Sequence, residues 1–327
     1  MNRKYILRRL GLMVFSLFVV ATVLFFLFRQ IPGGPVAAMA PPGGPLPEDV
    51  RQRLMEQYGL DQPLWRQYLL FITNLLQGDL GVSFYYSAPV SGIIIDRATN
   101  TLGLMLIAIV ISYITGVFIG AHLGWIRGSK LERVEMFFVL FVRSMPVFWT
   151  GLLVLYIFSF QLNLFPIGGM RTVGSDASGF AALTDFLYHV ALPTLSLSLF
   201  YTGLPLLLMR NNMLEVITAD YIQTARAKGL PRRRIIFTHA ARNAVLPVVT
   251  AFAIAIGFSI GGQVLIETVY SWPGLGREMV DSATRSDYPL AQGTFLVLAA
   301  LVITMNFIAD IAYTYLDPRV SVGGEGE

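Results

Sequence analysis

The chain has 327 residues, of which 55% are hydrophobic and only 13% are charged, and its mean hydropathy is +0.62. A soluble domain of this length would carry roughly a quarter charged residues, so the composition excludes an ordinary soluble protein and indicates a helical membrane protein. Cysteine is absent, which excludes a disulfide framework and a cysteine-ligated metal, and three scattered histidines do not suggest a metal site.

Six stretches are apolar enough to cross a bilayer, which takes about 20 residues. We expect spans at Leu10–Phe28, Thr101–Trp125, Val134–Phe160, Val190–Met209, Ala244–Ile266 and Leu290–Tyr315. The first stretch follows four cations like a secretory signal, but its apolar core is longer than such signals have, so we expect a retained helix. The sequence therefore predicts an all-α membrane protein with six transmembrane helices.

The lysines and arginines predict the orientation of the spans. If the N-terminus lies inside, most of the 24 cations flank the spans on the cytoplasmic side, as the positive-inside rule requires, and both termini are cytoplasmic. The predicted organisation is an N-terminal tail and first span (residues 1–30), a long outer segment (31–97), a five-helix core (98–316) and a cytoplasmic tail (317–327).

The outer segment carries a helical pattern. A Pro- and Gly-rich part, Pro32–Pro47, precedes Glu48–Gln77, where apolar residues recur at helical spacing. We expect amphipathic helices on the outer surface. They either cover the helix bundle or form part of a docking face for a soluble partner, and the sequence does not choose between these.

The most informative segment, residues 212–247, lies on the cytoplasmic side between the fourth and fifth spans. About fifteen helix-forming residues lead to Gly229, a natural C-cap, and Pro231 prevents the helix from continuing. A second helix is expected from Arg232 towards the next span, interrupted by Pro247. The six cations of the segment, with Arg210 just before it, would alone suit the positive-inside rule and contact with anionic lipid. The Gly-Leu-Pro break and the alanine content favour a short helix that docks into a cleft of a partner.

This segment resembles the EAA loop of ABC-importer permeases, and closely that of the dipeptide, oligopeptide and nickel branch, which reads DYxxTARAKGL and then HAxRNAxLP. The matching residues are Asp220-Tyr221, Thr224–Leu230, His239-Ala240, Arg242-Asn243-Ala244 and Leu246-Pro247. The glutamate of the general EAA pattern is not kept, since Gln223 stands there. Because the peptide branch shares this departure from the general pattern, the resemblance is to that branch in particular.

Further short motifs follow in the family's order over most of the chain. They are Pro32-Gly33-Gly34-Pro35, Gly59–Pro63, Gly78–Phe84, Pro89-Val90, Ser144, Pro146, Phe148-Trp149, His189, Ala191–Pro193, Pro273–Gly276, Asp287-Tyr288-Pro289 and Leu316–Arg319. Gly34 stands where the family usually has aspartate. The order is similar to that of the B-type permease, the subunit with the long first outer loop.

The resemblance implies a type I ABC-importer permease in the inner or plasma membrane of a prokaryote. It implies a C-type permease, two ATPase subunits and an extracytoplasmic binding protein as partners, beside membrane lipid, and no nucleic acid. The residues expected to couple to the ATPases are Asp220, Tyr221, Gln223, Thr224, Ala225, Arg226, Ala227, Lys228 and Gly229. No phosphate-binding loop G-x-x-x-x-G-K-[ST] occurs in the sequence, so we expect the partner ATPases to bind ATP and Mg²⁺ and this chain to hold no catalytic, cofactor or metal site.

Two other sets of residues stand out. Arg143 and Asp310 lie at similar depths in the third and sixth spans, where charges are costly, and a buried ion pair is one interpretation. Structural packing is the alternative. On the outer side, Trp272, Pro273, Gly274 and Gly276 lie in an acidic loop that is a candidate contact for the binding protein.

Two other classes of protein remain to be weighed. A secondary transporter would usually show ion-coupling charges and repeated halves, and a membrane enzyme would need a nucleophile, metal cluster or paired acids at membrane depth. Neither pattern is visible. Peptides are the first expectation for the cargo, with nickel chelates, glutathione and oligosaccharides as alternatives.

Overall fold

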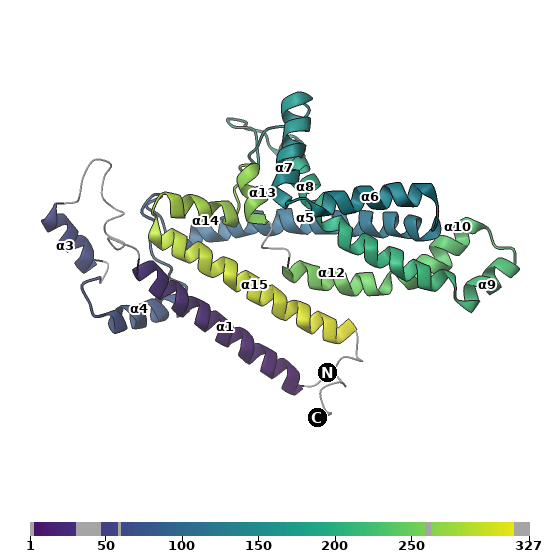
Figure 1. Cartoon of the computed structure of the whole chain (residues 1–327). Helices are drawn as coiled ribbons and strands as arrows, with labels where there is room; N and C mark the ends of the chain where they lie inside the picture. The colour runs from purple at the N-terminus through teal and green to yellow at the C-terminus, as the bar shows by residue number, and fades with distance from the viewer. Residues whose placement is uncertain (1–2, 31–46, 58–59, 259–262, 317–327) are drawn as a thin grey trace. The chain divides into compact units, whose positions relative to one another are not determined.

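The computed structural model describes residues 3–30, 47–57, 60–258 and 263–316, which are mostly helical (Figure 1). The helices are α1 (Arg3–Arg29), α3 (Glu48–Gln57), α4 (Leu64–Leu76), α5 (Val90–Trp125), α6 (Lys130–Ser144), α7 (Val147–Leu155), η1 (Tyr156–Gln161), α8 (Gly179–Ile217), α9 (Asp220–Ala227), α10 (Arg232–Arg234), η2 (Ile235–Ala240), α11 (Ala241–Ala244), α12 (Leu246–Phe258), α13 (Gln263–Val269), α14 (Leu275–Thr284) and α15 (Tyr288–Leu316). The whole of the expected tail at 317–327 and residues 32–46 of the Pro- and Gly-rich part lie outside the described residues.

Four of these helices are long and apolar enough to span a membrane without a break. They are Tyr5–Arg29, Val90–Trp125, Gly179–Ile217 and Tyr288–Ile311, and they confirm the first, second, fourth and sixth expected spans. Two further pairs of helices satisfy the same criterion only if each bent pair is one span. The two amphipathic helices expected between the first two spans are present as α3 and α4.

The third expected span, Val134–Phe160, is sharply bent in the middle. Between α6 and α7 the axis turns by 105° at Met145 and Pro146. Proline lacks the amide hydrogen that the preceding turn would need, and its ring forces the residue before it into an extended conformation. Met145 has this conformation, with φ −77° and ψ 141°. The fifth expected span, Ala244–Ile266, is also broken: Arg232–Ala244 and Leu246–Ile256 meet at 48°, just before Pro247, and residues 259–262 are outside the described part.

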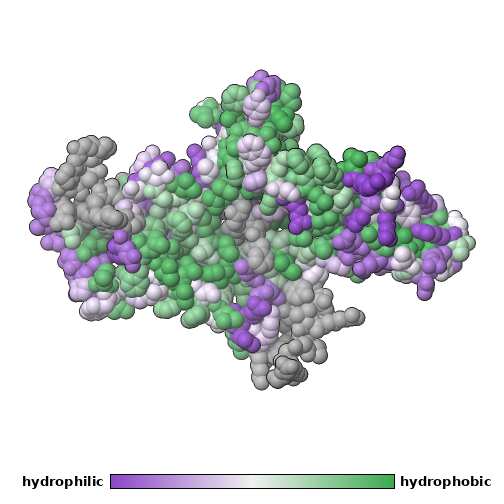
Figure 2. All heavy atoms as spheres, in the orientation of Figure 1, coloured by the Kyte–Doolittle hydropathy of each residue, from purple (hydrophilic) through white to green (hydrophobic). Residues whose placement is uncertain are grey.

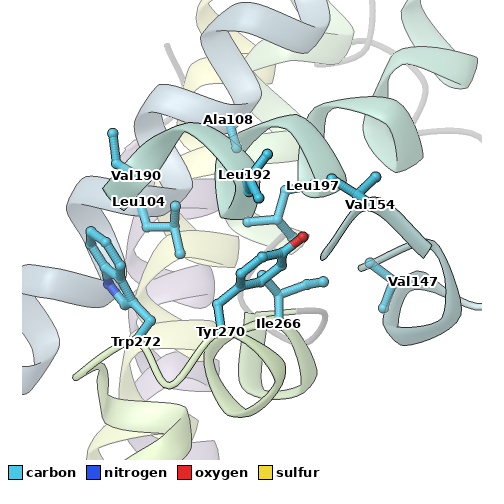
Figure 3. Packing of buried hydrophobic residues seen from close by; sticks show 10 residues of the cluster. All are labelled: Leu104, Ala108, Val147, Val154, Val190, Leu192, Leu197, Ile266, Tyr270 and Trp272. Carbon is cyan, nitrogen blue, oxygen red and sulfur yellow. The ribbon is translucent and has the colours of Figure 1, made fainter. Parts of the chain in front are cut away.

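The chain divides into two compact units, of which one consists mainly of Leu102–Trp272 and the other mainly of Leu7–Thr101 and Pro273–Thr304. The core of the first unit lies where α7, α8 and α13 pack together with α5, as Figure 3 shows. Tyr270 lies among the aliphatic side chains of this cluster. Its hydroxyl donates to the carbonyl of Gly151 at 3.0 Å and lies 2.9 Å from the hydroxyl of Ser196. The polar end of a buried ring is thus satisfied, and it joins α7 to α8.

Helices α5 and α8 pack with their backbones almost in contact. A Cβ atom added to Gly116 would lie 2.7 Å from Cγ of Pro205, and one added to Gly124 would lie 2.6 Å from Cβ of Met213. Between them, a Cβ on Gly120 would lie 2.4 Å from the carbonyl oxygen of Leu206. Only glycine allows this approach. The three glycines are spaced by four residues and form one stripe, the small-residue pattern of close helix pairs in membranes.

In the second unit, Asp287 holds the loop that contains Gly78–Phe84. Its carboxylate accepts hydrogen bonds from the hydroxyl of Ser83 and from the backbone amides of Phe84 at 3.2 Å and Tyr85 at 3.1 Å. Asp287 is 1% exposed, so these donors replace the water that the charge has lost. Two motifs that lie about 200 residues apart in the sequence therefore form one buried polar network.

Replacing Asp287 by alanine should lower the free energy of unfolding by about 2 kcal/mol, because several buried donors would lose their acceptor. Asp281 offers the control, since its carboxylate is one-third exposed and pairs with Arg277 and Arg285, which are also about one-third exposed. Asp281→Asn should change stability by less than about 1 kcal/mol. Thermal unfolding of the detergent-purified variants measures both, and equal shifts would contradict the role given to Asp287.

Candidate functional site

The segment expected to contact a partner forms a helical hairpin at one end of the first unit. Helix α8 runs as far as Ile217, well past the expected end of its span at Met209, and α9 starts after a two-residue break at Thr218 and Ala219. The expected helix of about fifteen residues is therefore two helices, of which α9 has eight residues. Figure 1 shows α9 and α10 at the end of α8 and α6 that lies away from α7.

Helix α9 presents one face inward and the other outward. Ile222 is fully buried and Ala225 is 6% exposed, so these two side chains fix the helix against its own chain. The exposed residues are Asp220, Tyr221, Gln223, Thr224, Arg226, Ala227, Lys228 and Gly229. All nine expected coupling residues thus lie on α9 or directly after it. Eight of them are exposed, and the buried side chain of Ala225 helps to hold α9 against the rest of the chain.

Gly229 ends α9 in the way that the sequence predicts. Its φ is +70°, and the amide of Gly229 donates to Arg226 at 2.9 Å while the amide of Leu230 donates to Ala225 at 3.3 Å. This is the Schellman pattern, which satisfies the last carbonyls of a helix and requires a left-handed residue after it. No atom lies within 4 Å of the position of a Cβ at Gly229, so the glycine is needed for its backbone and not for space.

The second arm of the hairpin returns from Pro231 through α10, η2 and α11. Its middle part, Ile235–Ala240, is a π-helix, which the sequence does not predict. Two asparagines fasten this arm: Asn243 donates to the hydroxyl of Tyr221 on α9, and Asn212 on α8 donates to the carbonyl of Ala244, each at 3.0 Å. The family motif residue Asn243 therefore holds the two arms together.

A partly buried ion pair joins the base of the hairpin to the turn between α5 and α6. Arg210 on α8 donates through two nitrogens to Glu132, which is 5% exposed. Glu132 also accepts from the amide of Gly128 at 2.6 Å, and the hydroxyl of Ser129 accepts from the amide of Glu132 at 3.0 Å. Ser129 is thus the N-cap of α6, and the side chain of Glu132 reaches back to the amide of the residue before the cap.

Charged side chains gather at the hairpin. Figure 2 shows many hydrophilic residues at the right-hand end of the view, where Figure 1 places α9 and α10. These polar side chains cover the end of an apolar helix bundle. Such a surface suits contact with water or with a polar partner.

The other candidate residues occupy different places. The aliphatic part of Arg143 lies on Gly203 of α8, and Asp310 lies on α15; their ion pair stays a prediction. Trp272 is 1% exposed and belongs to the buried cluster of Figure 3, next to Phe186. Gly274 and Gly276 are buried too, so a contact with a binding protein in this region would involve exposed neighbours of these residues.

Two features of the site were missed at the level of sequence. The stripe Gly116, Gly120 and Gly124 is a visible G-x-x-x-G-x-x-x-G pattern inside an apolar stretch, and it could have been recognised. The pairing of Glu132 with Arg210 could not, because nothing local links residues that are 78 positions apart.

Comparison with known proteins decides the family. A model described as the binding-protein-dependent transport system inner membrane component matches residues 112–322, and the model of its N-terminal part matches residues 1–105. The chain belongs to this family. It is therefore a multi-pass component of the inner membrane and a subunit of an ABC importer, as the resemblance in the EAA loop implies.

Individual relatives match this chain over almost its whole length. The dipeptide transport system permease protein DppB of Escherichia coli K12 is 37% identical, over 97% of this chain and 98% of its own. A putative peptide permease of Brucella suis is 38% identical over 98% and 99%, and the oligopeptide permease AppB of Bacillus subtilis is 36% identical over 97% and 98%. These relatives are permease subunits, which are not themselves enzymes.

A solved structure supports the fold. An amino acid ABC transporter crystallised with histidines superposes with a TM-score of 0.50 at 14% identity, over 70% of this chain and 94% of that one. At this identity the likeness concerns the fold alone.

Proposed function

We propose that α9 is the coupling helix of this importer subunit and that it docks on one of two ATPase subunits. The observation that carries the proposal is the construction of α9: a short helix that is closed by Gly229, anchored by Ile222 and exposed along its other face. A helix held in this way offers the rigid anchor that helix-in-groove recognition needs.

We also propose how a movement of the ATPase subunits reaches the membrane helices. The coupling helix follows directly on α8, which packs on α5 through glycines and is tied to α6 through Arg210 and Glu132. A displacement of α9 would therefore move α8, α5 and α6 together as one rigid body, which is how rocking transporters change the side that is open. ATP and Mg²⁺ would bind in the ATPase subunits.

We further propose six spans with both termini in the cytoplasm, a C-type permease as the second membrane subunit and an extracytoplasmic binding protein that delivers the cargo. Peptides are the proposed cargo, because the relatives named above are dipeptide, peptide and oligopeptide permeases. Nickel chelates, glutathione and oligosaccharides are the alternatives. Uptake of a labelled dipeptide, measured with and without an excess of each of these compounds, tests the cargo. A complete importer that takes up no dipeptide would contradict the proposal.

Gly229→Val should reduce uptake about tenfold while the chain still inserts in the membrane, because a β-branched residue at φ +70° costs about 1–2 kcal/mol and distorts the end of α9. Gly174→Val is the matched control: Gly174 has φ +76° and an equally open surrounding, but it lies in the loop before α8. Uptake and copurification of the ATPase subunits measure the effect. If both variants lowered uptake equally, the loss would be one of folding, and α9 would have no special role.

A charge reversal gives a second test of the same face. Asp220 stands in the first turn of α9, where its carboxylate faces solvent and favours the positive end of the helix dipole. Asp220→Lys should abolish uptake without loss of the inserted chain. Transport at the level of the unmodified protein would exclude this face as the docking surface.

A further inference from the structure

A pocket of about 250 Å³ lies where α5 ends, where α8 ends and where the hairpin returns. Its lining residues are Gly124, Trp125, Arg127, Leu214, Ile217, Thr218, Arg226 and Arg232. Three of these carry guanidinium groups and three carry large apolar side chains, and no carboxylate lines the pocket. The lining thus has an apolar part, Trp125, Leu214 and Ile217, which we call the floor, and a cationic part, Arg127, Arg226 and Arg232, which we call the rim.

Trp125 holds two of the cations in place. The guanidinium carbon of Arg226 lies 5.6 Å from the centre of the indole ring, and that of Arg232 lies 5.2 Å from it. Cation–π contacts fix a guanidinium without neutralising it. Neither arginine forms an ion pair within the part of the chain that the structure describes. Two like charges on one ring repel each other, so the arrangement favours an anion between them.

The chemistry of the rim favours a phosphate group. Planar guanidinium groups bind phosphate oxygens through pairs of parallel hydrogen bonds, and several of them converge on one cavity here. The floor favours a lipid as the source of that phosphate. Trp125 ends a membrane-spanning helix, and Leu214 and Ile217 continue the apolar surface of another one, so the acyl end of a ligand would meet apolar side chains.

We propose that this pocket binds the headgroup phosphate of an anionic phospholipid from the cytoplasmic leaflet. The headgroup would connect Arg127 after α5 with Arg226 on α9 and Arg232 on α10. It would therefore brace the hairpin against the membrane helices. This inference goes beyond the proposed function and does not depend on the cargo. Like the proposed function, it requires that the hairpin lies on the cytoplasmic side of the membrane.

The test compares two double variants of the full-length chain, purified with its partner subunits in nanodiscs. Arg127→Gln with Arg232→Gln removes two cations from the pocket. Arg133→Gln with Arg242→Gln removes two cations from the same side of the chain, and neither of these residues lines the pocket. Native mass spectrometry would measure retention of phosphatidylglycerol against phosphatidylcholine.

The pocket variant should lose phosphatidylglycerol about tenfold more readily than the unmodified chain, and the control variant should stay within about twofold. Trp125→Leu should weaken retention as well, because both arginines lose their support. Equal loss in the two double variants would overturn the proposal, since net charge alone would then explain the binding.

Two further outcomes distinguish other occupants. If inorganic phosphate in excess displaces the phospholipid, the pocket is a site for free phosphate and the lipid assignment fails. If the pocket variant keeps the phospholipid but loses its ATPase subunits, the pocket receives a carboxylate of an ATPase and the proposal is overturned. Intact ATPase copurification together with lost lipid supports the proposal and leaves the coupling role of α9 untouched.

Discussion

Gly120→Val should prevent the chain from accumulating as a folded membrane protein. The added Cβ would lie 2.4 Å from the carbonyl oxygen of Leu206 and 2.8 Å from Cβ of Met209, and the first of these atoms belongs to the backbone of α8. A side chain that meets backbone cannot be accommodated by a change of rotamer, so α5 and α8 must separate. Overpacking of this kind costs typically 1–3 kcal/mol and more where the backbone has to shift.

The control lies on the same helix. Gly103 is exposed, and no atom lies within 4 Å of the position of its Cβ. Gly103→Val introduces the same β-branched residue into α5 and should leave the yield of folded protein within about twofold, since helix propensity alone differs little between these residues. Size-exclusion chromatography of detergent extracts would measure both. A Gly120→Val variant that folds and transports normally would contradict the close packing of α5 on α8.

Glu132→Gln should destabilise the protein by about 2 kcal/mol. The substitution leaves the charge of Arg210 without its counterion, and the loss is smaller than for a fully buried cation because the side chain of Arg210 is 23% exposed. Glu132 is 5% exposed and accepts from both Arg210 and the amide of Gly128, so water cannot easily take its place. Thermal unfolding of the purified chain measures the loss.

An exposed pair provides the comparison for this prediction. Asp49 and Arg53 on α3 lie 3.2 Å apart, and both side chains are more than 60% exposed. Asp49→Asn should therefore cost less than about 0.5 kcal/mol. The double variant Glu132→Gln with Arg210→Met should regain part of the stability, because it removes the stranded cation. No difference between Glu132→Gln and Asp49→Asn would show that the partly buried pair does not hold the hairpin.

The sequence was sufficient for local features of the site. Gly229 and Pro231 predicted a stop and a restart because each has a backbone requirement that acts within one or two residues. Of the six apolar stretches expected to span the membrane, four correspond to unbroken helices. A proline alone does not determine whether a helix breaks: Pro193 and Pro205 lie inside the continuous helix α8, whereas the axis turns by 105° at Pro146.

What the sequence did not predict depends on partners that are distant along the chain. Asp287 belongs to a recognisable motif, but its role became visible only when Ser83 and two backbone amides were found around it. Trp272 was expected at the surface because its loop is polar and acidic, and it is buried because the neighbouring helices supply an apolar cluster for the ring. Burial of this kind follows from tertiary packing, which no local pattern encodes.

Crosslinking from single cysteines tests the coupling role of α9 most directly. The chain contains no cysteine, so each introduced thiol is the only one in it. Gln223→Cys places a thiol on the exposed face of α9, and Val173→Cys places one on a fully exposed residue of the loop before α8, which we expect on the outer side. With a short bifunctional crosslinker, the first thiol should link to an ATPase subunit and the second should not. Failure of Gln223→Cys to link to an ATPase subunit in an importer that transports normally would contradict the account.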